Sequence, residues 1–359
     1  MKFPSTPSIL ILAAAFGAGA GIIATSITLN SLRDYSAAIS STGSISLSTE
    51  RPRSEPESFE QAVQEIREKV VPSTVELFSA PTDSTGAYEP GEGSGSGFFI
   101  TSDGWILVAP NNLSTLEISR SIILFGQKIY PVQEVASDAF SPVVFIKIEI
   151  SNAPVTSFGN ALAVEPGDNL FVAGAFGSIL PTSLFRFVQI GSISAPADVV
   201  NRRLELGQSL DKSFGGAAVS NSSGEVVGIL IADGSAITST VLPITAVRPI
   251  IHSLLKDGTA SGLLFGAVAT DLSRAIGYDE IFTRDYTRGA LLGTISKGSP
   301  AEAAGLQKGD IVISVGGLEI NERQSLAELL SYYRVGNTVN LVVDSEGVIL
   351  KVDLVLGSR

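Results

Sequence analysis

The order of apolar and polar positions predicts a short helix followed by a long β region. Between residues 58 and 67 the apolar side chains share one helical face, and Pro72 is expected to end this helix. Beyond it, short apolar runs alternate with turns rich in Gly, Pro, Asn and Asp, a pattern typical of an all-β sandwich or barrel. The expected strands are residues 74–78, 98–100, 105–108, 121–125, 143–148, 170–173, 185–193, 226–231 and 237–242.

The amino-terminal segment from Ser8 to Leu29 has no charged residue and is rich in Ile, Leu, Ala and Gly. A helix needs about 20 such residues to cross a bilayer. We therefore predict a membrane anchor at residues 1–33, with the spanning helix at about residues 8–30. Lys2 precedes the span, which favours a cytoplasmic amino terminus and folded domains outside the cytoplasm. A cleaved signal peptide ending near Ala18-Gly19-Ala20 is the alternative.

Residues 34–56 are rich in Ser and Thr and show no helical or strand period, which predicts a flexible linker. The whole chain of 359 residues carries a formal net charge of −12, which argues against a nucleic-acid partner. It has no cysteine and one histidine. Disulfides and thiolate chemistry are thereby excluded, and we expect no metal site and no cofactor.

The stretch from Leu210 to Ile229 places the pair Gly215-Gly216 before an apolar strand, a polar turn and a second apolar strand. It resembles the nucleophile loop of trypsin-like serine proteases of the HtrA type. Residues 95–107 resemble the opening of that protease domain, and residues 242–255 resemble its closing strand and following helix. The resemblance implies two six-stranded β-barrels over residues 57–256.

The carboxy-terminal region, residues 257–359, resembles a PDZ domain through Lys297–Leu306 and the following Lys308–Val312. Ser299 can cap a short helix that starts at Pro300, and Gly305 can end it. A second helix is expected at residues 325–332, and two strands at residues 338–343 and 348–355. The predicted fold class is therefore mainly β: a chymotrypsin/trypsin-like double β-barrel followed by an α+β PDZ domain, with an amino-terminal transmembrane helix.

Serine-protease catalysis needs a hydroxyl nucleophile, an imidazole base and a carboxylate that orients the base. When the HtrA pattern is carried over, these three positions hold Phe214, Asn111 and Pro142. The oxyanion hole uses the N–H of the nucleophile and of a glycine two residues before it, and Lys212 stands at that glycine position. We therefore expect no catalytic residue at the positions of the serine-protease triad. The chain would be an enzyme only if its active site were of a different kind.

Few other residues offer a substitute site. His252, the sole histidine, falls on the helix that leaves the second barrel and is expected to be a partly exposed helix residue. Ser213 and Lys212 could form a catalytic Ser-Lys pair only if their side chains pointed the same way, whereas adjacent side chains generally point apart. Asp138 could be a displaced orienting carboxylate, but it lacks an imidazole to orient.

A PDZ groove adds a peptide as an extra strand and holds its carboxylate with backbone N–H groups. The resemblance places this carboxylate loop at Leu264, Phe265, Gly266 and Ala267. Leu326 and Leu330 would line the pocket for the last side chain of the peptide. The alternative is that all six are core residues of a purely structural domain.

These features favour a membrane-anchored HtrA-like pseudoprotease that binds peptide C-termini or unfolded chains, in protein quality control or scaffolding. One alternative is a regulatory subunit of an active relative, since the resemblance implies trimers, either homo-trimers or mixed oligomers. The other is an active serine endopeptidase with a non-standard site.

Overall fold

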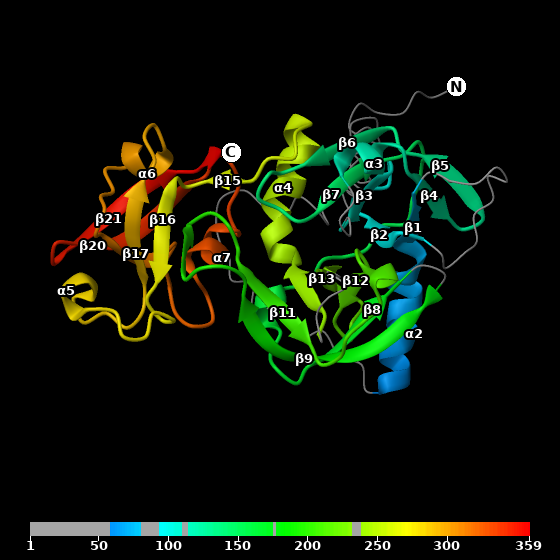
Figure 1. Ribbon diagram of the computed structural model, residues 1–359, viewed down its shortest axis with the longest axis horizontal. Helices are drawn as coiled ribbons and strands as arrows, with labels where there is room; N and C mark the ends of the chain where they lie inside the picture. Colours follow the sequence, from blue (N-terminus) through cyan, green and yellow to red (C-terminus); the bar gives the residue numbers. More distant parts are fainter. Residues whose placement is uncertain (1–57, 80–92, 110–113, 175–176, 232–237) are drawn as a thin grey trace, which may run out of the picture. The chain divides into compact units, whose positions relative to one another are not determined.

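The computed structural model describes residues 58–79, 93–109, 114–174, 177–231 and 238–359 (Figure 1). The predicted anchor, the predicted linker and Asn111 lie outside the described residues. Within these ranges, no helix is both long enough and apolar enough to cross a bilayer.

The helix expected near residue 58 is present as α2 (Phe59–Lys69). The Ser58 side chain caps it by accepting the N–H of Gln61 at 3.2 Å, which satisfies one of the free donors of the first turn. Ala62 and Ile66 are buried and pack with residues of both β regions, such as Phe171. The helix therefore contributes to the apolar cluster that residues of both β regions share.

The first β region is one sheet of seven strands in the order β5-β4-β1-β2-β3-β7-β6. Its end strands β5 and β6 follow each other in the chain, from Lys128–Pro131 to Glu134–Ser137. Because β5 pairs with β4 and β6 pairs with β7, one bent strand closes the sheet, and the expected six-stranded barrel results. The other elements are β1 (Thr74–Phe78), β2 (Gly95–Phe99), β3 (Trp105–Val108), β4 (Ile122–Phe125), β7 (Val144–Lys147) and α3 (Thr115–Ser119).

The second β region is a closed six-stranded barrel in the order β11-β14-β13-β12-β8-β9, as expected. The strand expected at residues 185–193 is displaced: β9 spans Ile179–Gln189, because its first half pairs with β8 as a hairpin. The remaining strands are β8 (Asn169–Ala173), β11 (Arg202–Leu206), β12 (Ala218–Ser220), β13 (Val226–Ile231) and β14 (Thr240–Pro243). Helix α4 (Ile244–Asp257) leaves the barrel and ends at Gly258 in the left-handed conformation.

Several strands of the two barrels, such as β2 and β8, are apolar on both faces because both faces are buried. Phe98 packs in the cluster between the barrels, while its neighbour Phe99 packs inside the first barrel. Phe171 and Val172 divide in the same way between that central cluster and the interior of the second barrel. Since successive side chains of a strand point to opposite faces, a continuous apolar run serves two cores at once.

The carboxy-terminal domain has the expected mixed architecture, with its sheet in the order β10-β16-β17-β18-β20-β21. The predicted caps are present: Ser299 accepts the N–H of Glu302 in front of Pro300, and Gly305 follows at φ 80°. The second helix, α7, is shorter than expected and ends at Leu330. The elements are β15 (Leu263–Leu264), β16 (Ala267–Asp271), α5 (Glu280–Thr283), β17 (Ala290–Ile295), α6 (Pro300–Ala303), β18 (Ile311–Val315), β19 (Leu318–Glu319), α7 (Leu326–Leu330), β20 (Thr338–Ser345), β21 (Val348–Val355) and β22 (Gly357–Ser358).

One strand of this sheet does not belong to the carboxy-terminal domain. Strand β10 (Ser194–Pro196) lies between barrel strands β9 and β11 in the chain, yet it pairs antiparallel with β16. The second barrel therefore contributes the edge strand of its neighbour's sheet.

Candidate functional site

The loop Asp211–Ala217, called here the Gly-Gly loop, is a short 3₁₀ turn followed by the two glycines. The turn spans Lys212–Phe214, and the Asp211 carboxylate caps it by accepting the N–H of Ser213 at 2.9 Å. Gly216 adopts φ 86°, and an added Cβ there would collide with the carbonyl oxygen of Ser96. The loop is thus held against β2 of the first barrel.

Several backbone N–H groups of the Gly-Gly loop donate to carbonyl oxygens of the chain itself. The N–H of Phe214 donates to Asp211 O at 3.0 Å, and that of Gly215 donates to Lys212 O at 2.9 Å. The N–H of Gly216 donates to Leu230 O at 2.8 Å. An oxyanion hole requires N–H donors that point at the substrate, and the donor at the nucleophile position is engaged in the turn.

The phenyl ring of Phe214 packs against the apolar interior of the second barrel. It is half-buried and lies over Gly174, where an added Cβ would come within 3.0 Å of the ring. A hydrocarbon ring has no lone pair to attack a carbonyl carbon. At this position the side chain fills space and supplies apolar contact.

The other sequence-predicted positions are dispersed. Pro142 is exposed just before β7, and Asn111 lies outside the described residues. The Asp138 carboxylate accepts the Gly262 N–H at 2.8 Å and pairs with Arg359 at 3.1 Å. Asp138 therefore fastens the end of the chain to the first barrel and orients no base.

His252 lies on α4, partly exposed, as expected. Burial lowers the pKa of His252, and the positive charges of Arg334 and Lys256 lower it further against the opposing charge of Asp257. Lys212 is exposed to solvent, whereas Ser213 is half-buried and its carbonyl oxygen accepts the Ser96 hydroxyl at 3.1 Å.

The second candidate site is the loop Leu264–Ala267, called here the carboxylate loop. Gly266 adopts φ 85°, and a Cβ there would collide with the side chain of Ser299. The N–H groups of Phe265 and Gly266 both donate to Oδ2 of Asp198, at 2.7 and 3.2 Å. Two adjacent N–H groups that converge on one oxygen form an anion-binding concavity.

Residues of β16 and α7 share one apolar cluster beside this loop, in the place where the resemblance puts the peptide groove. Leu326 and Leu330 of α7 are buried, and Ala197 packs in the same apolar cluster with 3% of its surface exposed. Phe265 and Ala267 also belong to this cluster, while Leu264 is half-buried and pairs with Gly357. The structure therefore brings the six predicted groove residues to one region.

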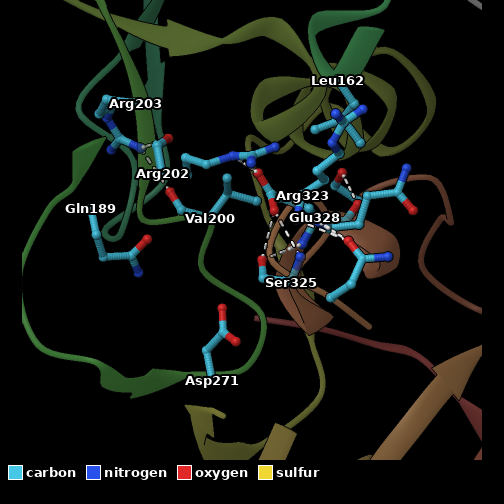
Figure 2. Close-up of polar contacts among 12 residues, drawn as sticks. Leu162, Gln189, Val200, Arg202, Arg203, Asp271, Arg323, Ser325 and Glu328 are labelled. Atoms are coloured by element: carbon cyan, nitrogen blue, oxygen red, sulfur yellow. Dashed lines mark hydrogen bonds and ion pairs between the residues drawn. The ribbon is translucent and has the colours of Figure 1, made fainter. Parts of the chain in front are cut away.

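Arg202 of β11 and Glu328 of α7 form an ion pair that joins helix α7 to the second barrel (Figure 2). Their side chains pair at 2.5 Å and are 5% and 1% exposed. Glu328 also accepts the N–H and hydroxyl of Ser325 at the start of α7, and Arg202 lies over the Phe187 ring. Burial lowers the pKa of Arg202, and the charge of Glu328 opposes that shift.

Neighbouring Arg203 points away from this pair in Figure 2 and donates to Val200 O at 2.7 Å. Burial lowers its pKa to about 10. Sequence reasoning did not select Ala197, Asp198, Arg202 or Glu328. The single local signal was the Ser325-to-Glu328 spacing of a capping box, which predicts the helix start and says nothing of an ion pair.

A family profile described as a PDZ domain matches residues 275–356. Two curated proteins named "probable periplasmic serine endoprotease DegP-like" are similar over 74% of this chain. The one from Rhizobium meliloti (strain 1021) is 27% identical and covered over 53% of its length. The one from Halomonas elongata is 28% identical and covered over 57%. The chain thus spans about half the length of the curated relatives it matches.

Among solved structures, the HtrA-type protease AlgW with a tripeptide has a TM-score of 0.56 at 18% identity. The same protease with a decapeptide has a TM-score of 0.55, and the match covers 84% of this chain and 99% of that one. At this identity the likeness shows the shared fold. It supports the trypsin-like double barrel followed by a PDZ domain.

Proposed function

We propose that this chain, a homologue of HtrA/DegP-like serine proteases with a PDZ domain, is a pseudoprotease that binds peptide carboxy termini in its PDZ groove. Its barrels would serve as a scaffold, and its groove would recognise free carboxy termini or the ends of unfolded chains. The domain limits are those predicted above, with the double barrel at residues 57–256 and the PDZ domain at residues 257–359.

The observation that carries the proposal is the carboxylate held by the carboxylate loop. Oδ2 of Asp198 receives the N–H groups of both Phe265 and Gly266. A peptide terminus presents the same chemical group, and main-chain pairing with β16 would supply the remaining affinity. The solved structures of the HtrA-type protease AlgW with a decapeptide and with a tripeptide support a peptide as the ligand.

The loss of proteolysis rests on two independent features of the Gly-Gly loop. Phe214 stands at the nucleophile position, and its N–H is engaged by Asp211 O. Restoring the hydroxyl alone would still leave the site without a base at Asn111 and without an orienting acid at Pro142.

The cellular placement in this proposal follows the sequence and the relatives. The curated relatives are named as periplasmic, which supports folded domains outside the cytoplasm. We propose that residues 8–30 anchor the chain as a single membrane pass, with oligomers formed through the protease-fold domain. Proteinase accessibility of the folded domains in intact cells and in lysed cells tests this orientation.

The activity test uses the purified full-length chain with unfolded casein and a serine-directed fluorophosphonate. The expected result is neither cleavage nor labelling. Cleavage that disappears in the Ser213→Ala variant would contradict the proposal and favour a non-standard endopeptidase. A peptide array with free and amidated carboxy termini tests the binding half, since the proposal requires that only free termini bind.

A further inference from the structure

The edge of β16 beside the carboxylate loop, where the peptide groove is proposed, already pairs with a strand of the chain itself. Ala195 of β10 lies opposite Ala269 of β16 in an antiparallel ladder. The ladder extends by one more bond, from the N–H of Ala197 to the carbonyl oxygen of Ala267 at 2.8 Å. A hydroxyl contact of 2.7 Å between Ser194 and Thr270 adds to it. This is the arrangement in which an added peptide strand binds a sheet edge.

The strand ends as a bound peptide would end, with a small side chain and then a carboxylate. Ala197 is buried in the apolar cluster that contains Leu326 and Leu330. The next residue, Asp198, places its carboxylate on the N–H groups of the carboxylate loop. The main chain then leaves the groove in a turn closed by the bond from Val199 N to Pro196 O at 3.2 Å.

We propose that Ser194–Asp198 is an internal ligand that closes the groove, so that a free carboxy terminus binds only by displacing it. The competing peptide would end in a residue as small as alanine, because Ala197 is 3% exposed in the apolar cluster that contains Leu326 and Leu330. This inference rests on the proposed peptide-binding function and adds to it a gate and a preference for the last residue.

A tethered ligand competes strongly because it is always near its site. The effective concentration of a segment on a short connection is of the order of millimolar. An external peptide sees only the fraction of molecules whose groove is open, and its apparent affinity falls by that fraction. The wild-type chain should therefore bind free peptides weakly even though the groove itself is well formed.

Displacement of the internal ligand would also change contacts of the second barrel, because the same chain segment joins the two. Arg202, four residues beyond Asp198, forms the buried ion pair with Glu328 on the groove helix (Figure 2). Arg274, which follows β16, contacts Gln189 at the end of β9. A peptide that removes β10 from the groove would pull on the segment between β9 and β11, which leads directly into Arg202 at the start of β11.

The test measures binding of a fluorescein-labelled peptide Gly-Ser-Ile-Ser-Ala-Pro-Ala, a copy of residues 191–197 with a free carboxylate, to the full-length chain. The variant Asp198→Asn keeps the shape of the side chain and removes the charge that strengthens its bonds to the loop. We expect this variant to bind the peptide about tenfold more tightly than wild type, and the amidated peptide to bind neither. Asp353→Asn is the matched control, because Asp353 is exposed on β21 at the opposite end of the sheet from β10.

Hydrogen exchange at the amides of Ala197, Phe265 and Gly266 gives a second measurement that needs no external peptide. Faster exchange at these amides in Asp198→Asn, but not in Asp353→Asn, supports the internal ligand. If the exchange rises and no free peptide binds either protein, the internal ligand stands and the proposed peptide-binding function fails. If wild type and Asp198→Asn bind the peptide equally and exchange alike, peptide binding stands and the internal ligand is overturned.

Discussion

Two loops of this chain present clusters of backbone N–H groups, and the two clusters have different partners. In the Gly-Gly loop, the N–H groups of Phe214 and Gly215 donate to carbonyl oxygens within the loop. In the carboxylate loop, those of Phe265 and Gly266 donate to a carboxylate supplied by another part of the chain. The N–H groups of Phe214 and Gly215 thus bind within their own loop, whereas those of Phe265 and Gly266 bind a negative group from elsewhere in the chain.

Both loops nevertheless keep a glycine at nearly the same positive φ, Gly216 at 86° and Gly266 at 85°. In each, an added Cβ would collide with a neighbouring element, β2 in one case and Ser299 in the other. A glycine retained in the Gly-Gly loop therefore indicates a packing requirement and is not by itself a sign of catalysis. What separates the loops is the direction of their donors.

The largest effect is expected from Gly216→Ala, which tests whether the Gly-Gly loop is mainly a packing element. The new Cβ collides with the Ser96 carbonyl at a backbone angle that alanine disfavours, so unfolding should become easier by about 4 kcal/mol. Gly258→Ala is the control, since Gly258 also has a positive φ but no neighbour within 4 Å. It should cost about 1 kcal/mol. Equal midpoints for the two variants in urea unfolding would contradict this role.

A somewhat smaller effect is expected from Glu328→Ala, which tests how the carboxylate-loop domain is attached to the barrel. It leaves the buried Arg202 guanidinium without its partner and removes the cap on Ser325, at a cost of about 3 kcal/mol. Glu322→Ala breaks an ion pair to Arg288 in which both side chains are 60% exposed. That control should change stability by less than about 1 kcal/mol. Similar losses in thermal unfolding would mean that the Arg202 pair does not fasten the domains.

Phe214→Ser tests whether one residue separates this loop from an active one. We expect no casein cleavage and no fluorophosphonate label, because the position expected for the base holds Asn111 and not an imidazole. Loss of half-buried ring contact should cost about 1–2 kcal/mol of stability. The control Phe282→Ser alters a ring that is 59% exposed and should leave stability within about 0.5 kcal/mol. Labelling of the introduced hydroxyl in the Phe214→Ser variant would show that the loop is a single step from activity.

The smallest effect concerns His252 and the acid side of the stability profile. Its pKa in the folded protein is lowered by burial and by Arg334 and Lys256, so the unfolded chain binds the proton more readily. Stability should therefore fall as the pH drops below about 6.5, until the folded-state pKa is passed. His252→Gln should flatten this part of a thermal-unfolding series, and because the chain has one histidine no other imidazole contributes. If stability depended on pH equally in His252→Gln and in wild type, a group other than His252 would be responsible for the pH dependence.

Local patterns predicted most of the architecture. The strands at Thr74–Phe78 and Val226–Ile231 and the Ser299 cap were readable from neighbouring residues, because alternation, turn chemistry and capping act over a few positions. The position of Phe214 was equally readable, since a side chain that cannot act as a nucleophile needs no coordinates to be recognised. The bent strand β5–β6 was missed, because its side chains are largely exposed and show no alternation.

The sequence by itself predicted the two barrels and the following domain, and it placed Phe214, which has no nucleophilic group, at the expected position of the nucleophile. Only the tertiary structure decided what lies in the groove. Ser194-Ala195-Pro196 has no strand pattern and includes a proline, and its partner strand lies about 75 residues further along the chain. A ladder of this kind forms because two domains meet, and Asp198 acquires its partners only at that contact. The physical reason is range: caps and turns depend on adjacent residues, whereas strand addition depends on a surface that the rest of the fold must first build.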